Sequence, residues 1–218
     1  MRDVKDPKVR KAEIMEAALF LFAQKGYLNT TTQDIIDKVK ISRGLLYYHF
    51  KNKEDILYCL VERYSEPLLQ KLSTIAYEPN RSAMEKIKSF MEVTIISPDT
   101  ITSEMIELQK TVDLEQNRYL MDRFSHNFTN KLIIYFTHII EQGISEKAFH
   151  VGYPSETAAF LITGYVFVSN EIKTLPIDIE KSKAYIIAFQ TLLARTLGAD
   201  ISFLPTESMK INIDFLNT

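Results

Sequence analysis

The sequence has one cysteine and only six glycines among its 218 residues. The single Cys59 excludes an internal disulfide and provides no cysteine cluster for zinc. The glycines lie too far apart to form a phosphate-binding or dinucleotide-binding loop. Ser-x-x-Lys and Gly-x-Ser-x-Gly patterns are also absent, which removes two common serine-nucleophile motifs. We therefore expect a protein that is not an enzyme and that has no cofactor.

Long hydrophobic runs are missing as well. The longest stretch without a charged residue has 14 residues, between Glu156 and Glu171, whereas a membrane-spanning helix needs about 20. The polar N-terminal segment has no apolar core of the kind found in secretory signals. We therefore expect a cytoplasmic protein with no membrane partner.

The composition favours helices, and the charge is unevenly distributed. Apolar residues make up 46% of the chain, and the segments between its few glycines and prolines are rich in helix-forming residues. Residues 1–53 carry 11 lysines and arginines against 6 acidic residues, whereas residues 54–218 carry 15 against 22. A basic N-terminal part on an acidic remainder is typical of a nucleic-acid contact in the basic part, although a solvated basic face would give the same pattern.

Apolar positions recur at helical spacing along the chain, and no segment alternates as a strand does. A buried stripe is expected on the first helix at Ile14, Ala18, Leu21 and Phe22. Pro67 should kink or interrupt the fourth helix. The sequence predicts an all-α protein with helices at about 8–25, 32–39, 43–50, 52–72, 82–96, 101–112, 116–143, 155–172 and 179–197.

Residues 31–53 contain the pattern that indicates function. Thr31 and Asp34 form a capping box before a short helix, and Ser42 opens a second short helix after a tight turn. Two short helices of this kind, braced by a preceding helix, are typical of a helix-turn-helix. In the second helix Leu46 and Phe50 should face inward. This leaves a face toward a DNA groove that carries Arg43, Leu45, Tyr48 and His49, with Tyr47 near its boundary.

This segment resembles the DNA-binding motif of the TetR family of bacterial transcriptional regulators. The resemblance covers about residues 8–60. It is carried by Gly26-Tyr27, Thr31-Thr32, Ile35, Ser42-Arg43-Gly44, Leu46-Tyr47 and the run from His49 through Phe50-Lys51-Asn52-Lys53-Glu54-Asp55-Ile56 to Leu57.

The resemblance implies a role for each matching residue. Thr32 and Gln33 would contact phosphate or a base edge at the start of the second helix, and Lys53 would clamp a phosphate from the fourth helix. In the second short helix, the recognition helix that would enter the DNA groove, Arg43, Gly44 and Leu45 would face bases. The DNA-contacting residues implied in this way are Thr32, Gln33, Ser42, Arg43, Gly44, Leu45, Tyr47, Tyr48, His49 and Lys53.

The sequence departs from the family pattern at two places. Val39-Lys40-Ile41 replaces the usual Ala-Gly-Val before the serine, and Ile36 replaces a usual alanine. Glycine suits a left-handed turn, so Lys40 would cost about 1 kcal/mol if the geometry is retained. The chain also begins with a basic segment containing Arg2, Lys5, Lys8, Arg10 and Lys11, either an arm that enters a minor groove or a solvated tail.

The two last long helices are expected to form a dimer interface. The segment 156–171 is apolar almost all round, and the helix at 179–197 carries a broad apolar stripe. Paired with the same helices of a second chain, they would form a four-helix contact, as the resemblance also implies. The expected interface residues are Phe160, Leu161, Gly164, Tyr165, Val168, Tyr185, Phe189, Leu192 and Leu193.

The middle helices are expected to enclose an effector pocket. Phenylalanine and methionine dominate its candidate residues, which favours an apolar or amphipathic small molecule, although the same spacing is common in ordinary cores. The candidates are Tyr64, Phe90, Met91, Met105, Tyr119, Phe124, His126 and Phe128.

The sequence thus predicts an N-terminal helix-turn-helix domain (1–53), a helical effector-binding and dimerisation domain (54–200) and a tail (201–218). The predicted function is a ligand-responsive regulator, a repressor that binds a pseudo-palindromic operator in double-stranded DNA as a homodimer and is released by a small molecule. The alternative is a helical adaptor without specific DNA binding. His138 and Glu141 are three residues apart on one predicted helix, but the second Glu-x-x-His motif that a di-iron bundle requires is missing, so no metal site is expected.

Overall fold

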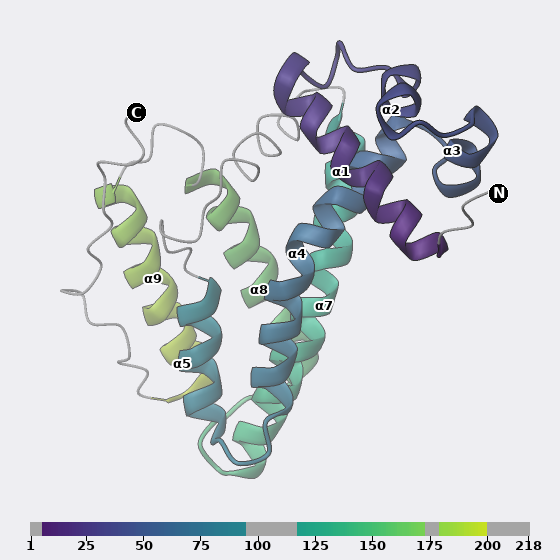
Figure 1. Ribbon diagram of the computed structural model, residues 1–218. Helices are drawn as coiled ribbons and strands as arrows, with labels where there is room; N and C mark the ends of the chain where they lie inside the picture. The colour runs from purple at the N-terminus through teal and green to yellow at the C-terminus, as the bar shows by residue number, and fades with distance from the viewer. Residues whose placement is uncertain (1–5, 95–116, 173–178, 200–218) are drawn as a thin grey trace. The chain divides into compact units, whose positions relative to one another are not determined.

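The computed structural model describes residues 6–94, 117–172 and 179–199, and every regular element in these ranges is an α-helix (Figure 1). This confirms the all-α prediction. No helix in the same ranges is long and apolar enough to cross a membrane. The helices are α1 (Pro7–Lys25), α2 (Thr32–Val39), α3 (Arg43–His49), α4 (Lys53–Tyr77), α5 (Ala83–Thr94), α7 (Arg118–Ser145), α8 (Pro154–Ile172) and α9 (Ile179–Leu197).

Most helix boundaries lie within two residues of those predicted from the sequence. α4 differs more, because it ends at Tyr77 rather than near residue 72, and it is not interrupted at Pro67. A proline within a helix removes one backbone hydrogen bond, and the flanking turns of α4 retain the helix on both sides. The helix expected at 101–112 and the tail at 201–218 lie outside the described residues.

The chain divides into two compact units. The first holds the described residues of Met1–Pro67 and Ile101–Ser125, and the second holds those of Leu68–Thr100 and His126–Thr218. α4 and α7 therefore each begin in the first unit and end in the second. The two units are defined by which residues of the chain pack together. The boundary expected after residue 53 separates DNA-contacting from regulatory helices, and it stays a prediction.

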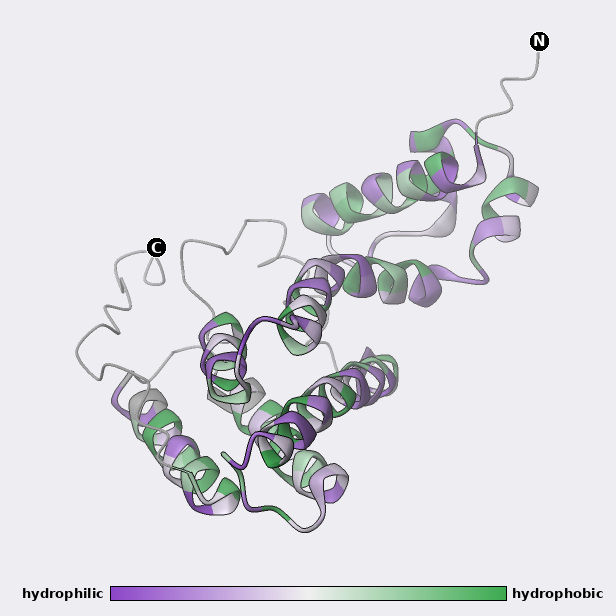
Figure 2. Cartoon of the chain, turned by 90° about the horizontal axis from the view of Figure 1, so that it is seen from below, coloured by the Kyte–Doolittle hydropathy of each residue, from purple (hydrophilic) through white to green (hydrophobic). Residues whose placement is uncertain are grey.

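The core of the first unit lies between α1, the two short helices and the first half of α4. Ile14, Ala18, Leu21 and Phe22 of α1 are buried in it, which confirms the predicted stripe. Figure 2 shows hydrophobic and hydrophilic residues interspersed along the helices, as burial of one helix face requires. The core is completed by Met15, Tyr27, Ile35, Ile36, Leu46, Phe50, Ile56, Leu57 and Leu60.

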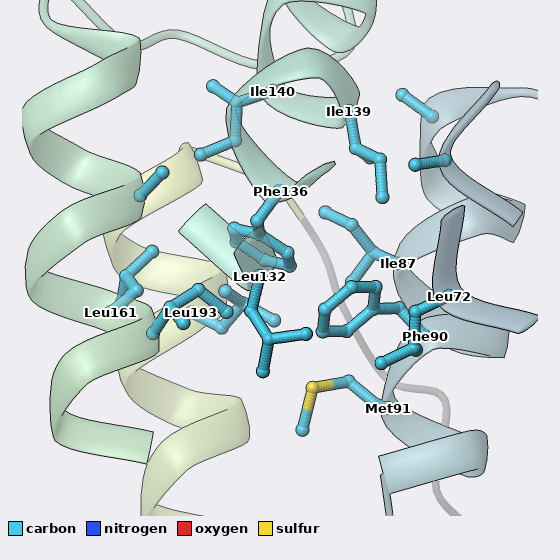
Figure 3. Packing of buried hydrophobic residues seen from close by; sticks show 14 of the residues in the cluster. Leu72, Ile87, Phe90, Met91, Leu132, Phe136, Ile139, Ile140, Leu161 and Leu193 are labelled. Carbon is cyan, nitrogen blue, oxygen red and sulfur yellow. The ribbon is translucent and has the colours of Figure 1, made fainter. Parts of the chain in front are cut away.

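The core of the second unit is built from α5, α7, α8, α9 and the second half of α4. Figure 3 shows Ile87 and Phe90 of α5 close to Leu132 and Phe136 of α7. The rings of Phe90 and Phe136 pack edge to face, with centroids 5.4 Å apart. Apolar contacts of this kind hold the second unit together.

One buried lysine joins three helices at the end of the second unit. Lys86 of α5 is only 2% exposed, and its Nζ donates to the backbone carbonyl of Ala76 at 2.9 Å and to Gln142 Oε1 at 2.6 Å. Ala76 lies in the last turn of α4, where carbonyls have no partner within the helix. Glu146 of α7 accepts from the backbone N–H of Ala83 at the start of α5. The carbonyl of Ala76 at the end of α4 and the N–H of Ala83 at the start of α5 thereby have hydrogen-bond partners.

Candidate nucleic-acid interface

The start of α2 is fixed by a reciprocal pair of hydrogen bonds. The backbone N–H of Asp34 donates to Thr31 Oγ1 at 3.1 Å, and the backbone N–H of Thr31 donates to the Asp34 carboxylate at 2.7 Å. This confirms the predicted capping box. Hydrogen bonds from Lys25 and then Thr31 hold the pKa of Asp34 well below its usual range. Thr32 and Gln33 therefore occupy a defined first turn.

The turn between α2 and α3 contains a residue in the left-handed conformation. Lys40 has φ 57° and ψ 48°, and its backbone N–H donates to the carbonyl of Ile36. The backbone N–H of Ile41 donates to the same carbonyl at 3.2 Å. The chain thus retains the turn geometry that suits glycine, with a lysine in that position. The Cβ of Lys40 makes this conformation unfavourable by about 1 kcal/mol.

Lys40→Gly is expected to raise the free energy of unfolding by about 1 kcal/mol, because glycine adopts φ near 57° without strain. Urea unfolding followed by circular dichroism measures the change. Lys38→Gly, within α2, is the matched control and is expected to lower stability by about 1 kcal/mol. A loss of stability in both variants would contradict the strain at Lys40.

α3 buries one side and exposes the other. Ser42 caps it by accepting a hydrogen bond from the backbone N–H of Leu45 at 3.2 Å. Leu46 and the following Phe50 are buried in the core of the first unit, as predicted. Tyr48 is 75% exposed. A large aromatic side chain exposed to that extent on a helix of seven residues does not stabilise the core, so it is available to a partner.

Tyr47 connects the exposed face of α3 to the start of α2. Its hydroxyl has a lowered pKa, first because of a hydrogen bond with Thr32 and then because of one with Arg43. The Arg43 guanidinium lies 5.6 Å from the centroid of the Tyr47 ring. Together with exposed Gly44 these residues form a continuous polar surface over the two helices. Hydroxyl and guanidinium groups on such a surface are donors for phosphate oxygens and base edges.

His49 lies at the end of α3 in a basic environment. Burial, then the charge of Lys11 and then that of Arg10, lower the pKa of His49. Its ring packs edge to face on Tyr48, with centroids 4.9 Å apart. The imidazole therefore favours its neutral form in the free protein, and it donates at most one hydrogen bond to a backbone phosphate.

Much of the N-terminal basic segment is helical. α1 begins at Pro7, so Lys8, Arg10 and Lys11 belong to its first two turns, whereas Arg2 and Lys5 lie outside the described residues. Arg10 pairs with Glu13 at 2.7 Å. The Lys11 ammonium lies 5.4 Å from the centroid of the Phe50 ring. Arg10 and Lys11 lie near the end of α3 and add to its basic surroundings, while an arm formed by residues 1–5 stays a prediction.

Lys53 contacts the loop between α1 and α2, and its contact with a phosphate stays a prediction. Its Nζ donates to the backbone carbonyls of Tyr27 at 2.7 Å and Thr30 at 2.9 Å. It also lies 4.1 Å from the centroid of the Tyr27 ring. Sequence reasoning missed these contacts, because Tyr27 and Thr30 lie 26 and 23 residues away along the chain.

Four of the expected dimer-interface residues lie on an exposed surface of the second unit. Phe160 is 83% exposed and Gly164 is also exposed on α8. On α9, Tyr185 is exposed and Leu192 is 52% exposed. The sequence reasoning missed Phe167, which is 66% exposed and follows Phe160 by seven residues, a spacing that returns to the same helix face.

The other expected interface residues face the core of their own chain. Leu161 and Leu193 are buried there. The rings of Tyr165 and Phe189 lie 4.8 Å apart between centroids and pack against the same core, so they join α8 to α9. Val168 is half-buried. Their contact with a partner chain stays a prediction.

The effector-pocket candidates do not form one group. In the second unit, Phe90 and Met91 are fully buried in the core, and Phe128 packs against that core. His126 Nε2 lies 3.1 Å from Asn130 Nδ2 in a hydrogen bond along α7. These residues fit ordinary packing, and their role in binding an effector stays a prediction.

The remaining candidates belong to the first unit or are not described. Tyr64 packs against the core of the first unit, and Phe124 packs edge to face on Tyr58 with centroids 6.3 Å apart. Tyr119 is mostly exposed. Met105 lies outside the described residues. The role of these residues in binding an effector likewise stays a prediction.

A cavity of about 450 Å³ lies in the second unit. It is lined by Tyr77, Pro79, Lys86, His138, Glu141, Gln142 and Ser145, so the effector candidates do not contribute to it. The Tyr77 and His138 rings pack against each other with centroids 4.6 Å apart. Among the described residues there is no group of three histidine, cysteine or acidic side chains that could hold a metal ion.

Comparison with known proteins places the candidate interface in a family. Residues 14–58 match the sequence pattern described as "Bacterial regulatory proteins, tetR family". The chain is 27% identical over 156 residues to the uncharacterised HTH-type transcriptional regulator YfiR of Bacillus subtilis, an alignment that covers 69% of this chain and 73% of YfiR.

A shorter alignment shows higher identity. The chain is 48% identical over 46 residues to IcaR of Staphylococcus epidermidis, the negative transcriptional regulator of the biofilm operon icaADBC. This alignment covers 21% of this chain and 25% of IcaR, so the likeness is local.

Solved structures of other proteins have a similar fold. The structure of SmeT, the repressor of the Stenotrophomonas maltophilia multidrug efflux pump SmeDEF, matches with a TM-score of 0.58 at 21% identity, over 88% of this chain and 92% of SmeT. That match shows a shared fold. All three proteins are transcription regulators by name rather than enzymes.

Proposed function

Because this chain is a DNA-binding transcription regulator of the TetR family, we propose that it acts as a homodimeric repressor of a pseudo-palindromic operator and that a small molecule releases it. The names of IcaR and SmeT as a negative regulator and a repressor support this sign of regulation by analogy. We place its action in the cytoplasm, where the DNA of bacteria lies.

The observation that carries the proposal is the two-sided construction of α3. One side is buried through Leu46 and Phe50, while Arg43, Gly44 and Tyr48 on the other side are exposed. A short helix with a firmly anchored inner side holds its outer side chains rigidly, as base recognition in a major groove requires. Arg43 can donate two hydrogen bonds to a guanine edge, and Leu45 can contact a thymine methyl group.

The neighbouring polar residues support contacts to the DNA backbone. Thr32, Gln33 and Ser42 lie at helix N-terminal ends, where hydroxyl, amide and backbone donors bind phosphate well. Tyr47 and His49 extend this donor surface along α3. These contacts orient the domain, and the contacts of Arg43 supply sequence preference.

Dimerisation is supported by the exposed apolar surface of α8 and α9. Phe160, Phe167 and Leu192 are large hydrophobic residues with more than half of their surface exposed in the single chain. Exposed apolar groups of this size mark interaction surfaces. A second copy with the same two helices would cover them and would place two recognition helices for two half-sites, about 34 Å apart.

Release by an effector is proposed through α4. This helix runs without interruption from the first unit into the second, so a change in the packing of its second half is transmitted to its first half. An effector that binds better to one arrangement of the second unit shifts the population toward it. Operator affinity then falls by the ratio of the effector affinities for the two states.

Selection of random duplex DNA by the full-length protein, at about 0.15 M salt, tests this function. We expect recovery of a pseudo-palindrome with half-sites about one helical turn apart. Recovery of no sequence above background, with no binding at low salt either, would instead support an adaptor without DNA binding.

Arg43→Ala is expected to relax the selected sequence at one position in each half-site and to weaken binding of the parent operator by about 10–100-fold per head. Tyr47→Ala should weaken binding to all duplexes alike. Arg63→Ala is the matched control, since this exposed arginine of the first unit pairs with Glu16 at 3.3 Å on α1 rather than facing out from α3. If the Arg43 and Arg63 variants bind equally, the assigned base contact is wrong.

A further inference from the structure

We propose that Lys53 is a positioning residue that fixes the start of α2 for DNA binding, through the loop between α1 and α2, rather than a residue that binds phosphate. The proposal rests on the DNA-binding function above and assigns to Lys53 a different role from the one that the family resemblance implies. Four observations carry it.

First, three acceptors from the loop surround the Lys53 ammonium. These are the carbonyl oxygens of Tyr27 and Thr30, at 2.7 Å and 2.9 Å, and the ring face of Tyr27, whose centroid is 4.1 Å away. Two of the three N–H donors of the ammonium group are thus used by carbonyl oxygens, and the ring face adds a cation–π contact. Partial burial lowers the pKa of Lys53, as expected for an ammonium that faces protein. These contacts hold the ammonium group against the loop in the free protein, and a phosphate would have to share it with them.

Second, the loop is itself anchored to α1. Thr30 is buried, and its hydroxyl oxygen lies 2.8 Å from the carbonyl of Gly26 and 3.2 Å from that of Leu21. The Tyr27 ring packs edge to face on Phe22, with centroids 4.9 Å apart. The loop is therefore held from α1 on one side and from α4, through Lys53, on the other.

Third, a single peptide group connects Lys53 to the cap of α2. The Thr30 carbonyl that accepts from Lys53 belongs to the same peptide plane as the backbone N–H of Thr31. That N–H donates to the Asp34 carboxylate within the capping box. The orientation of this one plane thus sets both the contact with α4 and the first turn of α2, where Thr32 and Gln33 are placed.

Fourth, Lys53 is the first residue of α4, the helix that continues into the second unit. A movement of α4 at its first turn displaces Nζ relative to the two carbonyls. The start of α2 then moves with α4 or loses the bond. Lys53 therefore gives the proposed regulatory movement a direct connection to the DNA-contacting end of α2.

Hydrogen exchange of the free full-length protein and operator binding together test this role. In Lys53→Met, the Asp34 and Ile35 amides should exchange at least about tenfold faster, while those of Phe22 and Leu60 in the core change much less. Operator affinity should fall, but the slope of log affinity against log salt should stay unchanged, because Thr32 and Gln33 carry no charge. A phosphate contact would instead reduce the slope by about 0.9 for each head.

Two further variants sharpen the test. Lys53→Gln loses the charge but retains an amide that can donate to the carbonyls, so it should restore part of the exchange protection and affinity that Met loses. If Lys53→Met does not fold, Lys53→Gln is measured in its place. Lys38→Met is the matched control, because this lysine of α2 lies over the Phe20 ring, 3.6 Å from its centroid, and its loss should leave the start of α2 protected.

A reduced salt slope in Lys53→Met, equal behaviour of the Met and Gln variants, or uniform acceleration of exchange would each overturn the proposal. The proposed function fails separately, if the parent protein binds no duplex with sequence preference. The exchange measurement is made without DNA and decides the positioning of α2 in either case.

Discussion

Gly143→Ala is expected to lower the free energy of unfolding by about 2–3 kcal/mol, although alanine favours helix over glycine. A Cβ at position 143 of α7 would lie 2.0 Å from Cδ2 and 2.3 Å from Cε2 of the Phe149 ring. That ring is 2% exposed within the core of the second unit, so it cannot move away without disturbing its neighbours. Urea unfolding and the melting temperature measure the loss, at about 2–4 °C per kcal/mol.

The same substitution elsewhere and a double variant serve as controls. Gly44→Ala in α3 meets no atom within 4 Å and should gain up to about 1 kcal/mol in stability. In a Phe149→Ala background the penalty of Gly143→Ala should largely disappear, because the clashing ring is gone. An equal penalty with and without the ring would show that the clash is not the cause.

The second large effect is expected from charges placed on the exposed surface of α8 and α9. Phe160→Glu combined with Leu192→Glu should convert the protein to monomers, because like charges would be buried opposite each other in the proposed homodimer. Operator affinity should then fall at least about 100-fold, since each monomer holds only one half-site. Sedimentation velocity and operator titration measure the two results.

Ile134→Glu is the matched control for this pair. Ile134 is a hydrophobic residue of α7 with 58% exposure, comparable to Leu192, but it lies outside the proposed interface. This variant should remain dimeric and bind the operator as the parent protein does. A double variant that stays dimeric would exclude the surface of Phe160 and Leu192 as the interface, without affecting the assignment of α3.

The DNA-binding part of the chain is predictable because its signals are local. Thr31 with Asp34, Ser42 before α3, and Asn52 with Asp55 each satisfy backbone groups within three residues. Such caps form wherever the chain makes a helix start, so they can be recognised without tertiary contacts. The buried stripe of α1 and the inward side of α3 follow in the same way from helical periodicity.

The second unit is harder to predict, because α8 is apolar almost all round and its neighbours also carry broad apolar faces. The sequence assigns both Phe160 and Leu161 to one interface, yet the first is exposed and the second is buried in its own core. Periodicity specifies that a helix has an apolar face but not which neighbour covers it. Phe90 and Met91 illustrate the same limit, since aromatic and methionine side chains are common both in cores and in pockets.

By itself, the sequence determined the all-α class and the helix-turn-helix with its caps. These features depend on residues a few positions apart. Only the tertiary structure decided that Lys53 bonds to carbonyls more than 20 residues away and that Phe149 packs on Gly143. The physical reason is that such contacts depend on the direction in which whole helices meet, which packing of the complete core determines.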